Sequence, residues 1–232
     1  MTKYIFFDIG DVIFNEDLQH IWMFHTLLAT LRRHGAEVTW DEFDAHRISL
    51  AMTGPDPEAA IKESLRAFSP LPGEVDEYWH EARDLYEQMR KPRPYGLLLD
   101  GIEPVLRSLR NDYNLGIIAN QHPEVMEGLR DYGIAPLFDV IVISEIVGLF
   151  KPDPAIFNYA LEKTGISAEE AVFVGDRPDN DVRPAKALGF RTVRFRRGVQ
   201  YTYYTPSDAA QTADATVSDV RELGRVIRSV AQ

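Results

Sequence analysis

The chain has 232 residues, and its 36 acidic residues outnumber the 25 basic ones to give a formal net charge of -11. This balance argues against a nucleic-acid partner, whose phosphate backbone needs a basic face. Because the sequence contains no cysteine, disulfides, thiolate nucleophiles and zinc–thiolate sites are excluded. No apolar stretch approaches the roughly 20 residues that cross a bilayer, and no signal-type segment opens the chain. We therefore expect a soluble cytoplasmic protein with no membrane partner.

A buried strand is predicted at the start of the chain. Residues 3–7, Lys-Tyr-Ile-Phe-Phe, show no polar alternation, which is typical of a strand covered on both faces in a parallel sheet. Asp8 stands where this strand ends, at the edge of an open α/β sheet where ligands bind. A buried carboxylate there is costly unless a cation or donors meet it. From this segment alone, Asp8 is either a structural acid that caps the loop or a reactive group beside a metal.

Residues 16–95 are predicted to form an all-helical insert. Four amphipathic helical segments follow one another, separated by glycine- and proline-containing breakers. The apolar face of the first is expected to carry Leu18, Ile21, Leu28 and Leu31. The capping-box pair Thr39 and Glu42 opens the second, and Asp56 could cap the third with Pro57 at its first position.

Beyond residue 95 the pattern alternates between helices and strands. The predicted strands are residues 115–119, 140–143, 171–174, 192–195 and 215–217. Such alternation indicates βαβ units and a parallel sheet with right-handed crossovers. The first strand has to join this sheet to hide its apolar faces. The predicted fold is thus a doubly wound α/β core, residues 1–15 and 96–232, with the helical insert as a second domain.

Polar side chains recur where the core strands end. Asp8 follows the first strand, Asn120 the second, Lys151 lies in the loop after the third, and Asp176 and Asp181 follow the fourth. Each of them singly could be a turn residue, a surface residue or a helix cap. All of them are expected at the ligand-binding edge of the sheet, so together they predict a site.

In this order the residues resemble the haloacid dehalogenase superfamily, which consists mostly of phosphatases, and the resemblance covers nearly the whole chain. It makes Asp8 the nucleophile and Lys151 the cation that neutralises it, and matches Asn120 to the asparagine of the second motif. It also implies a Mg²⁺ ion bound by Asp8, the Gly10 carbonyl and Asp176, with Asp181 holding metal-bound waters. The insert resembles the family's helical cap, which carries substrate identity.

Two positions depart from the family pattern. Family phosphatases usually carry an acid two residues after the nucleophile, which protonates the leaving oxygen and later activates water. Gly10 stands there, with Asp11 one position late. The second motif usually opens with serine or threonine, and here it opens with Ala119. Asp11 could take over the acid–base role, or the role could fall to the cap or the substrate.

The prediction is a Mg²⁺-dependent phosphomonoester hydrolase that acts on a small phosphorylated metabolite through an aspartyl-phosphate. A metal-free 2-haloacid dehalogenase is one alternative, although it has no use for Asp176 and Asp181. A binding protein that has lost turnover is the other.

Two further clusters have no predicted role in catalysis. Four arginines, Arg191, Arg194, Arg196 and Arg197, are interpreted as a solvated strand end and not as a nucleic-acid patch. Tyr201, Tyr203 and Tyr204 fit either a packed loop or a homodimer contact.

Overall fold

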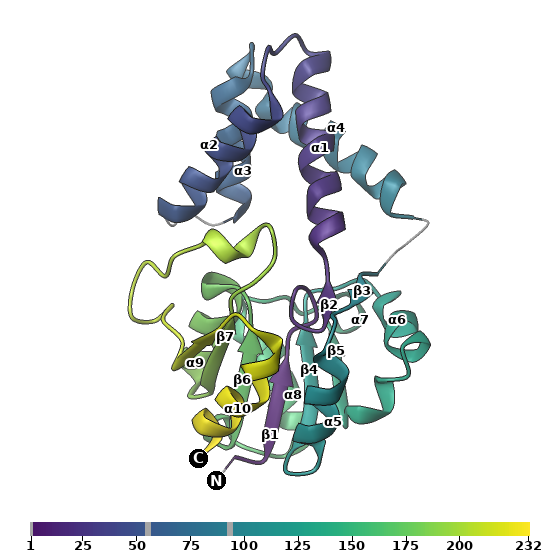
Figure 1. Ribbon diagram of the computed structural model, residues 1–232, viewed down its shortest axis with the longest axis vertical. Coiled ribbons are helices and arrows are strands. Elements are labelled where there is room, and N and C mark those ends of the chain that lie inside the picture. The colour runs from purple at the N-terminus through teal and green to yellow at the C-terminus, as the bar shows by residue number, and fades with distance from the viewer. Residues whose placement is uncertain (1, 54–56, 92–94) are drawn as a thin grey trace. The chain divides into compact units, whose positions relative to one another are not determined.

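The computed structural model describes residues 2–53, 57–91 and 95–232. The chain forms two compact units (Figure 1). One consists of Met1–Glu16, Tyr95–Gly198 and Pro206–Gln232, and the other of Asp17–Pro94 and Val199–Thr205. The sequence analysis did not anticipate that residues 199–205 belong with the helices. We call the two the α/β unit and the helical unit.

The α/β unit is built on a six-stranded sheet with the order β5-β4-β1-β6-β7-β8, in which every neighbouring pair is parallel. The strands are β1 (Tyr4–Phe7), β4 (Asn114–Ala119), β5 (Val140–Ile143), β6 (Ala171–Gly175), β7 (Arg191–Phe195) and β8 (Ala215–Val217). From β1 the chain builds outward through β4 to β5, and then returns to the other side of β1 for β6. This reversal creates the switch point at which doubly wound sheets bind ligands. The predicted fold class is confirmed.

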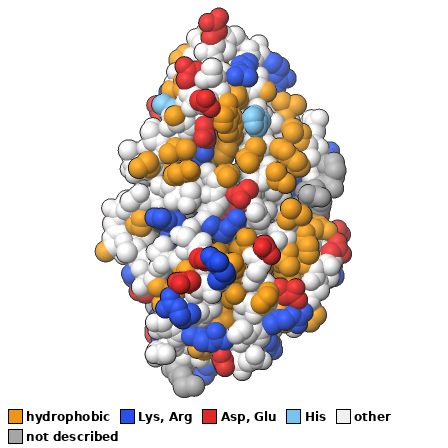
Figure 2. All heavy atoms as spheres, in the orientation of Figure 1, with side chains coloured by type: hydrophobic (Ala, Val, Ile, Leu, Met, Phe, Trp, Pro, Cys, Tyr) orange, Lys and Arg blue, Asp and Glu red, His pale blue; other side chains and the backbone are white. Residues whose placement is uncertain are grey.

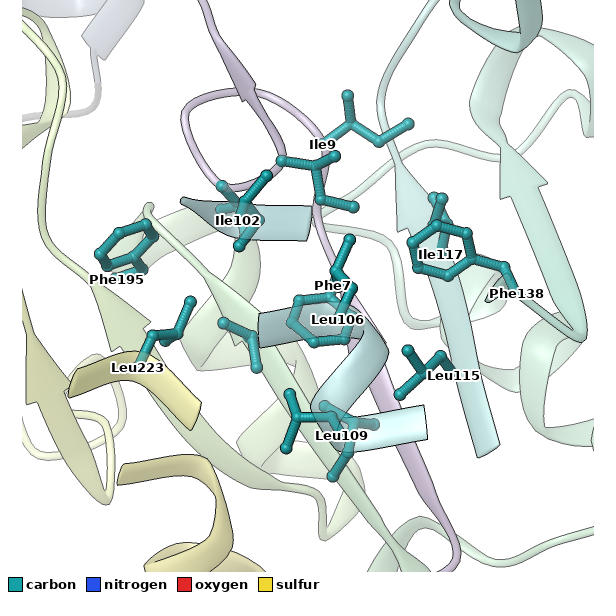
Figure 3. Packing of buried hydrophobic residues seen from close by; sticks show 14 of the residues in the cluster. Phe7, Ile9, Ile102, Leu106, Leu109, Leu115, Ile117, Phe138, Phe195 and Leu223 are labelled. Carbon is teal, nitrogen blue, oxygen red and sulfur yellow. The ribbon is translucent and has the colours of Figure 1, made fainter. Parts of the chain in front are cut away.

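Helices cover both faces of this sheet (Figure 1). Successive residues of β1 point to opposite faces, as a pleated strand requires. Phe7 packs in one cluster with α5 (Ile102–Arg110) and α10 (Val220–Ala231), as Figure 3 shows. Phe6 packs on the other side with α8 (Pro154–Thr164) and α9 (Arg183–Leu188). Because both faces are buried, the strands carry no polar alternation, which is the pattern that predicted them.

Several short elements connect or follow the strands of the sheet. Strands β2 (Phe14–Asn15) and β3 (Leu97–Leu98) form a small antiparallel pair that was not predicted. Helix α7 (Ser144–Val147) follows β5. Helix α6 (Val125–Asp131) and the 3₁₀ turns η2 (Ala135–Leu137) and η3 (Ala168–Glu170) lie between strands, and a π-helical turn, η4 (Pro178–Val182), leads into α9.

The helical unit contains α1 (Asp17–Arg33), α2 (Trp40–Thr53), α3 (Pro57–Phe68), the 3₁₀ turn η1 (Pro72–Glu74), α4 (Val75–Arg90) and the 3₁₀ turn η5 (Tyr201–Tyr203). The predicted capping box is present: the Thr39 N–H donates to Glu42 Oε2 at 2.9 Å, and the Glu42 N–H donates to Thr39 Oγ1 at 3.3 Å. The expected position of Leu18 on the buried face of α1 was wrong, since that side chain is 43% exposed. The Asp56 cap lies outside the described residues.

The tyrosine segment packs within the helical unit. Tyr201 makes an edge contact with His20 of α1 and a tilted contact with Tyr204, which is buried. Tyr201 and Tyr204 thus pack within this unit, whereas Tyr203 is exposed, so the homodimer contact stays a prediction.

No helix among the described residues is long and apolar enough to span a membrane. On the face drawn in Figure 2, Lys and Arg side chains are interspersed with Asp and Glu over the α/β unit.

Candidate active site

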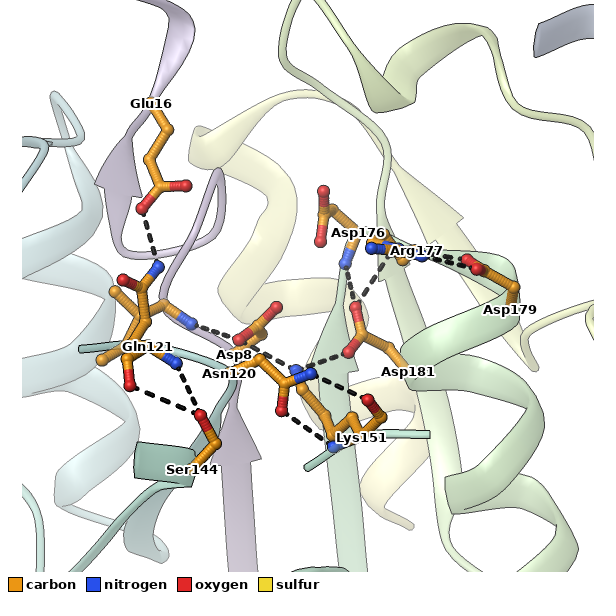
Figure 4. Close-up of polar contacts among 11 residues, drawn as sticks. Asp8, Glu16, Asn120, Gln121, Ser144, Lys151, Asp176, Arg177, Asp179 and Asp181 are labelled. Atoms are coloured by element: carbon orange, nitrogen blue, oxygen red, sulfur yellow. Dashed lines mark hydrogen bonds and ion pairs between the residues drawn. The ribbon is translucent and has the colours of Figure 1, made fainter. Parts of the chain in front are cut away.

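The strand ends bring the predicted polar residues together (Figure 4). The Asp8 N–H donates to the Val174 carbonyl at 2.9 Å, which extends the β1–β6 ladder by one residue and fixes Asp8 at the sheet edge. One carboxylate oxygen from each of Asp8, Asp176 and Asp181 lies within 4.8 Å of the others. Lys151 lies among them, with its ammonium 2.9 Å from Asp8 and 2.6 Å from Asp181. We call these four residues the acid cluster.

Asp8 is held by one oxygen only. Its Oδ1 accepts a hydrogen bond from the Ile9 N–H at 2.8 Å and contacts Lys151 Nζ. No described residue makes a hydrogen bond or ion pair with Oδ2, and 12% of the side chain is exposed. A carboxylate oriented in this way presents its second oxygen to a ligand while the first is fixed.

Asn120 holds the Lys151 backbone. Its Nδ2 donates to the Lys151 carbonyl and its Oδ1 accepts from the Lys151 N–H, both at 2.8 Å. These two bonds join the end of β4 to the loop after α7, and the Lys151 side chain then extends into the buried acid cluster. The position of Asn120 therefore explains how Lys151 reaches Asp8, which follows β1, and Asp181 in η4.

Asp181 holds the loop that carries Asp176. Its Oδ2 accepts from the Asp176 N–H at 3.1 Å and from the Arg177 N–H at 3.0 Å, while Oδ1 accepts from Lys151. In contrast, Asp176 Oδ2 is buried and has no hydrogen-bond partner among the described residues. A buried carboxylate oxygen without a donor is costly, and a bound cation would remove that cost.

Burial and mutual repulsion shift the pKa values of the acid cluster. Burial raises the pKa of Asp8 to about 6, against the lowering effect of Lys151. Burial, Asp181 and Asp8 together raise the pKa of Asp176 well above its usual range. Burial alone would lower the pKa of Lys151, but Asp181 and Asp8 outweigh it and raise that pKa. Three acids face one base, so the cluster favours either added protons or an added cation.

The loop between β1 and β2 places Asp11 away from solvent. Asp11 has a positive φ of 52° and is fully buried. Its Oδ1 accepts from Arg197 at 2.9 Å and from the Glu16 N–H at 3.2 Å, and Arg197 also donates to the Asp11 carbonyl at 3.2 Å. The acid–base role of Asp11 stays a prediction, for a buried carboxylate whose Oδ1 is held in this ion pair.

Gly10 leaves a space that another acid fills. A Cβ atom on Gly10 would lie 2.8 Å from Glu16 Oε2, the terminal atom of a flexible side chain. The other oxygen, Glu16 Oε1, accepts a hydrogen bond from Gln121 Nε2 at 2.8 Å, and Figure 4 shows these two side chains pointing toward each other. The Gln121 N–H in turn donates to Ser144 Oγ at 3.1 Å.

The sequence analysis missed Glu16, Gln121 and Ser144, and it misinterpreted the arginine cluster. Arg194 is 3% exposed and its Nε donates to the Asp176 carbonyl at 3.1 Å, and Arg197 holds Asp11. The prediction that the arginines form a solvated strand end was therefore wrong for Arg194 and Arg197. They support the loops that carry the site. Ala119, the other departure from the family pattern, is buried in β4.

The fold and these residues define a hydrolase of the haloacid dehalogenase type. The model of the haloacid dehalogenase-like hydrolase family matches residues 5–195, so the chain belongs to this family. It is 32% identical over 191 residues to a phosphoserine phosphatase from Thermus thermophilus. This alignment covers 81% of this chain and 72% of the relative. A glyceraldehyde 3-phosphate phosphatase from Methanocaldococcus jannaschii is 39% identical over 104 residues, 45% of this chain and 44% of the relative.

The same fold is found in solved structures of other proteins. A predicted phosphoglycolate phosphatase from Haemophilus somnus aligns with a TM-score of 0.67 at 20% identity, over 97% of this chain and 98% of the other. The chain is thus a phosphatase-like hydrolase of this family.

Proposed function

We propose that the protein is a Mg²⁺-dependent phosphomonoester hydrolase that acts on a small phosphorylated metabolite. The observation that carries the proposal is the pairing of Asp8 Oδ2, which has no hydrogen bond or ion pair with a described residue, with Asp176 Oδ2, which is buried without a donor among the described residues. One oxygen is placed to attack, and the other is placed to bind a cation.

The acid cluster fits a magnesium ion. Mg²⁺ prefers oxygen ligands, keeps several of its waters, and is commonly bound by one or two carboxylates together with substrate phosphate. Asp8 and Asp176 would hold the ion directly, with the Gly10 carbonyl as the expected main-chain ligand, and Asp181 would orient its waters. The ion would neutralise charge on the phosphoryl oxygens.

The chain's own residues then account for the reaction. Asp8 Oδ2 attacks phosphorus, the bond to the leaving oxygen breaks, and an aspartyl-phosphate forms, so that one difficult displacement becomes two easier ones. Lys151 keeps Asp8 Oδ1 fixed and offsets charge on the transferred group. Water then attacks phosphorus and releases phosphate and the Asp8 carboxylate.

A haloacid dehalogenase would use the same carboxylate on carbon. That reaction needs no divalent cation, and it leaves the donorless Asp176 oxygen without a purpose. The relatives named as phosphatases also favour phosphorus, and their names suggest phosphoserine and glyceraldehyde 3-phosphate as first substrates to try.

The test is a screen for phosphate release from phosphoserine, glyceraldehyde 3-phosphate and p-nitrophenyl phosphate, with Mg²⁺ and with a chelator. We expect turnover that disappears with the chelator and returns with Mg²⁺. Undiminished turnover in chelator, or halide release from a 2-haloacid, would contradict the proposal. Tight Mg²⁺ binding without any turnover would favour a binding protein instead.

A further inference from the structure

When the leaving oxygen departs from phosphorus it needs a proton, and the roles proposed for the acid cluster include no proton donor. An alkoxide is a poor leaving group unless a proton reaches it, and a positioned acid typically contributes about 10²–10⁴-fold in rate. The attack by water in the second step needs a base in the same place. One carboxyl group beside the nucleophile can serve both steps.

Three other acids of the α/β unit already have contacts or an assigned role at the site. Asp181 uses both oxygens, on Lys151 and on two backbone N–H groups. Asp176 has a buried Oδ2 without a hydrogen-bond partner among the described residues and is assigned to the proposed cation site. Asp11 is fully buried and accepts from Arg197 and from a backbone N–H.

We propose that Glu16 is the general acid and base of this enzyme, with Gln121 as its positioning residue. Glu16 is half-buried, and its carboxylate occupies the place that a side chain two residues after Asp8 would take. A Cβ atom on Gly10 would require Glu16 Oε2 to shift. This inference rests on the proposed phosphatase function.

The hydrogen bond from Gln121 explains how the Glu16 carboxyl group is oriented. Gln121 Nε2 donates to Glu16 Oε1, so Oε1 accepts in either protonation state and Oε2 carries the exchangeable proton. Gln121 directly follows Asn120 and is itself tied to Ser144. The amide that holds Lys151 and the amide that holds Glu16 therefore come from adjacent residues at the end of β4.

The proton balance closes over the two steps. In the first, Glu16 Oε2 gives its proton to the leaving oxygen as the phosphorus–oxygen bond breaks, which yields an alcohol, the Asp8 phosphate and a Glu16 carboxylate. In the second, that carboxylate takes a proton from water as the water oxygen bonds to phosphorus. The Asp8–phosphorus bond breaks, and Glu16 is protonated again.

The experiment compares Glu16→Gln with wild type on two substrates: the alkyl phosphate that wild type hydrolyses fastest in the screen, and p-nitrophenyl phosphate. We expect turnover of the alkyl phosphate to fall by about 10²–10⁴-fold. With the aryl phosphate, whose nitrophenolate leaves without a proton, only the second step should slow. The variant should therefore release a burst of nitrophenolate equal to the enzyme present and then turn over slowly. Glu162→Gln, an exposed residue of α8, is the matched control and should behave as wild type.

A swap tests the place of the acid as well as its identity. Glu16→Ala should lose alkyl turnover, and adding Gly10→Asp to that variant should recover at least about 10-fold of it, since the new carboxyl enters the space that Glu16 left. Wild-type alkyl turnover in Glu16→Gln, or an equal loss on both substrates without a burst, would overturn the assignment. A wild-type enzyme that releases no phosphate from any substrate would instead refute the phosphatase function itself.

Discussion

Two buried ionic groups lie at this sheet edge, and they differ in charge balance. The acid cluster sets Asp8, Asp176 and Asp181 against the single base Lys151, whereas the pair Asp11 and Arg197 sets one acid against one base. Both are built into loops that follow strands. The pair Asp11 and Arg197 is balanced in charge and links two loops. The acid cluster instead carries excess negative charge, which a bound cation would neutralise.

The difference indicates which buried charges belong to a site. Burying ions is costly, and evenly matched pairs recover that cost from one another. An excess of acids raises their pKa values and leaves them repelling one another, and such strongly perturbed groups cluster at functional sites. The two groups can therefore be told apart by experiment.

The largest expected effect is the loss of catalysis in the Asp8→Asn variant. The substitution removes the attacking charge at nearly constant shape, and we expect turnover to fall by roughly 10⁴–10⁶-fold, as for other nucleophiles. Because the cluster loses one of its repelling acids, the metal-free variant should melt no lower than wild type. Asp100→Asn, an exposed aspartate, is the matched control. An active Asp8→Asn enzyme would end the assignment of the nucleophile.

The next effect separates the two groups by stability. Lys151→Met removes the only base of the acid cluster and should lower the free energy of unfolding by about 3–5 kcal/mol. Arg197→Met should cost about 1–3 kcal/mol, because Arg197 is 15% exposed and water can reach the group that it leaves. Mg²⁺ should recover part of the loss for Lys151→Met and none for Arg197→Met in urea denaturation. Equal recovery in both variants would show that the cation does not bind the acid cluster.

The pH dependence of the metal-free protein should report the same excess of acids. A carboxyl whose pKa is higher in the folded chain holds more protons when folded, so its stabilisation is full below its ordinary pKa and is lost as pH rises through the folded value. With the pKa of Asp8 raised from 3.8 to about 6 and that of Asp176 raised as well, we expect the melting temperature to fall as the pH rises from about 4 through 6, and to fall further at higher pH as Asp176 ionises. Mg²⁺ should raise it more at pH 8 than at pH 5. In Asp176→Asn both trends should weaken, and a trend that persists unchanged would place its origin elsewhere.

The smallest expected effect concerns Asn120. Asn120→Ala removes the two hydrogen bonds to the Lys151 backbone, each worth about 1 kcal/mol, so the free energy of unfolding should fall by about 2 kcal/mol. Turnover should fall with it, since Lys151 is less well placed. Asn158→Ala, at an exposed position of α8, should change the free energy by less than about 0.5 kcal/mol. If the two variants match, Asn120 does not hold the loop.

The sheet and the acid cluster could be predicted because both follow from local rules. Unalternated apolar runs predicted the strands, and the ends of parallel strands meet at one edge, so Asp8, Asn120, Lys151 and Asp176 had to lie near one another. These predictions needed no knowledge of how any loop turns.

The residues that were missed depend on contacts between distant parts of the chain. Glu16 is 105 positions from Gln121, and Arg197 is 186 positions from Asp11. Local patterns carry no information on such pairs. The arginines were therefore judged by their like-charged neighbours in sequence, which suggested a solvated strand end. In the structure Arg194 is buried and Arg197 is partly buried in an ion pair. A glycine where an acid was expected was the one available signal for Glu16.

The most direct test is a crystal structure grown with Mg²⁺ and beryllium fluoride, which mimics a phosphoryl group on a carboxylate. The account predicts an adduct bonded to Asp8 Oδ2, with the metal between Asp8 and Asp176 and the Lys151 ammonium still on Asp8 Oδ1. An adduct on any other residue, or a metal bound away from Asp176 while Asp8 stays unmodified, would contradict it.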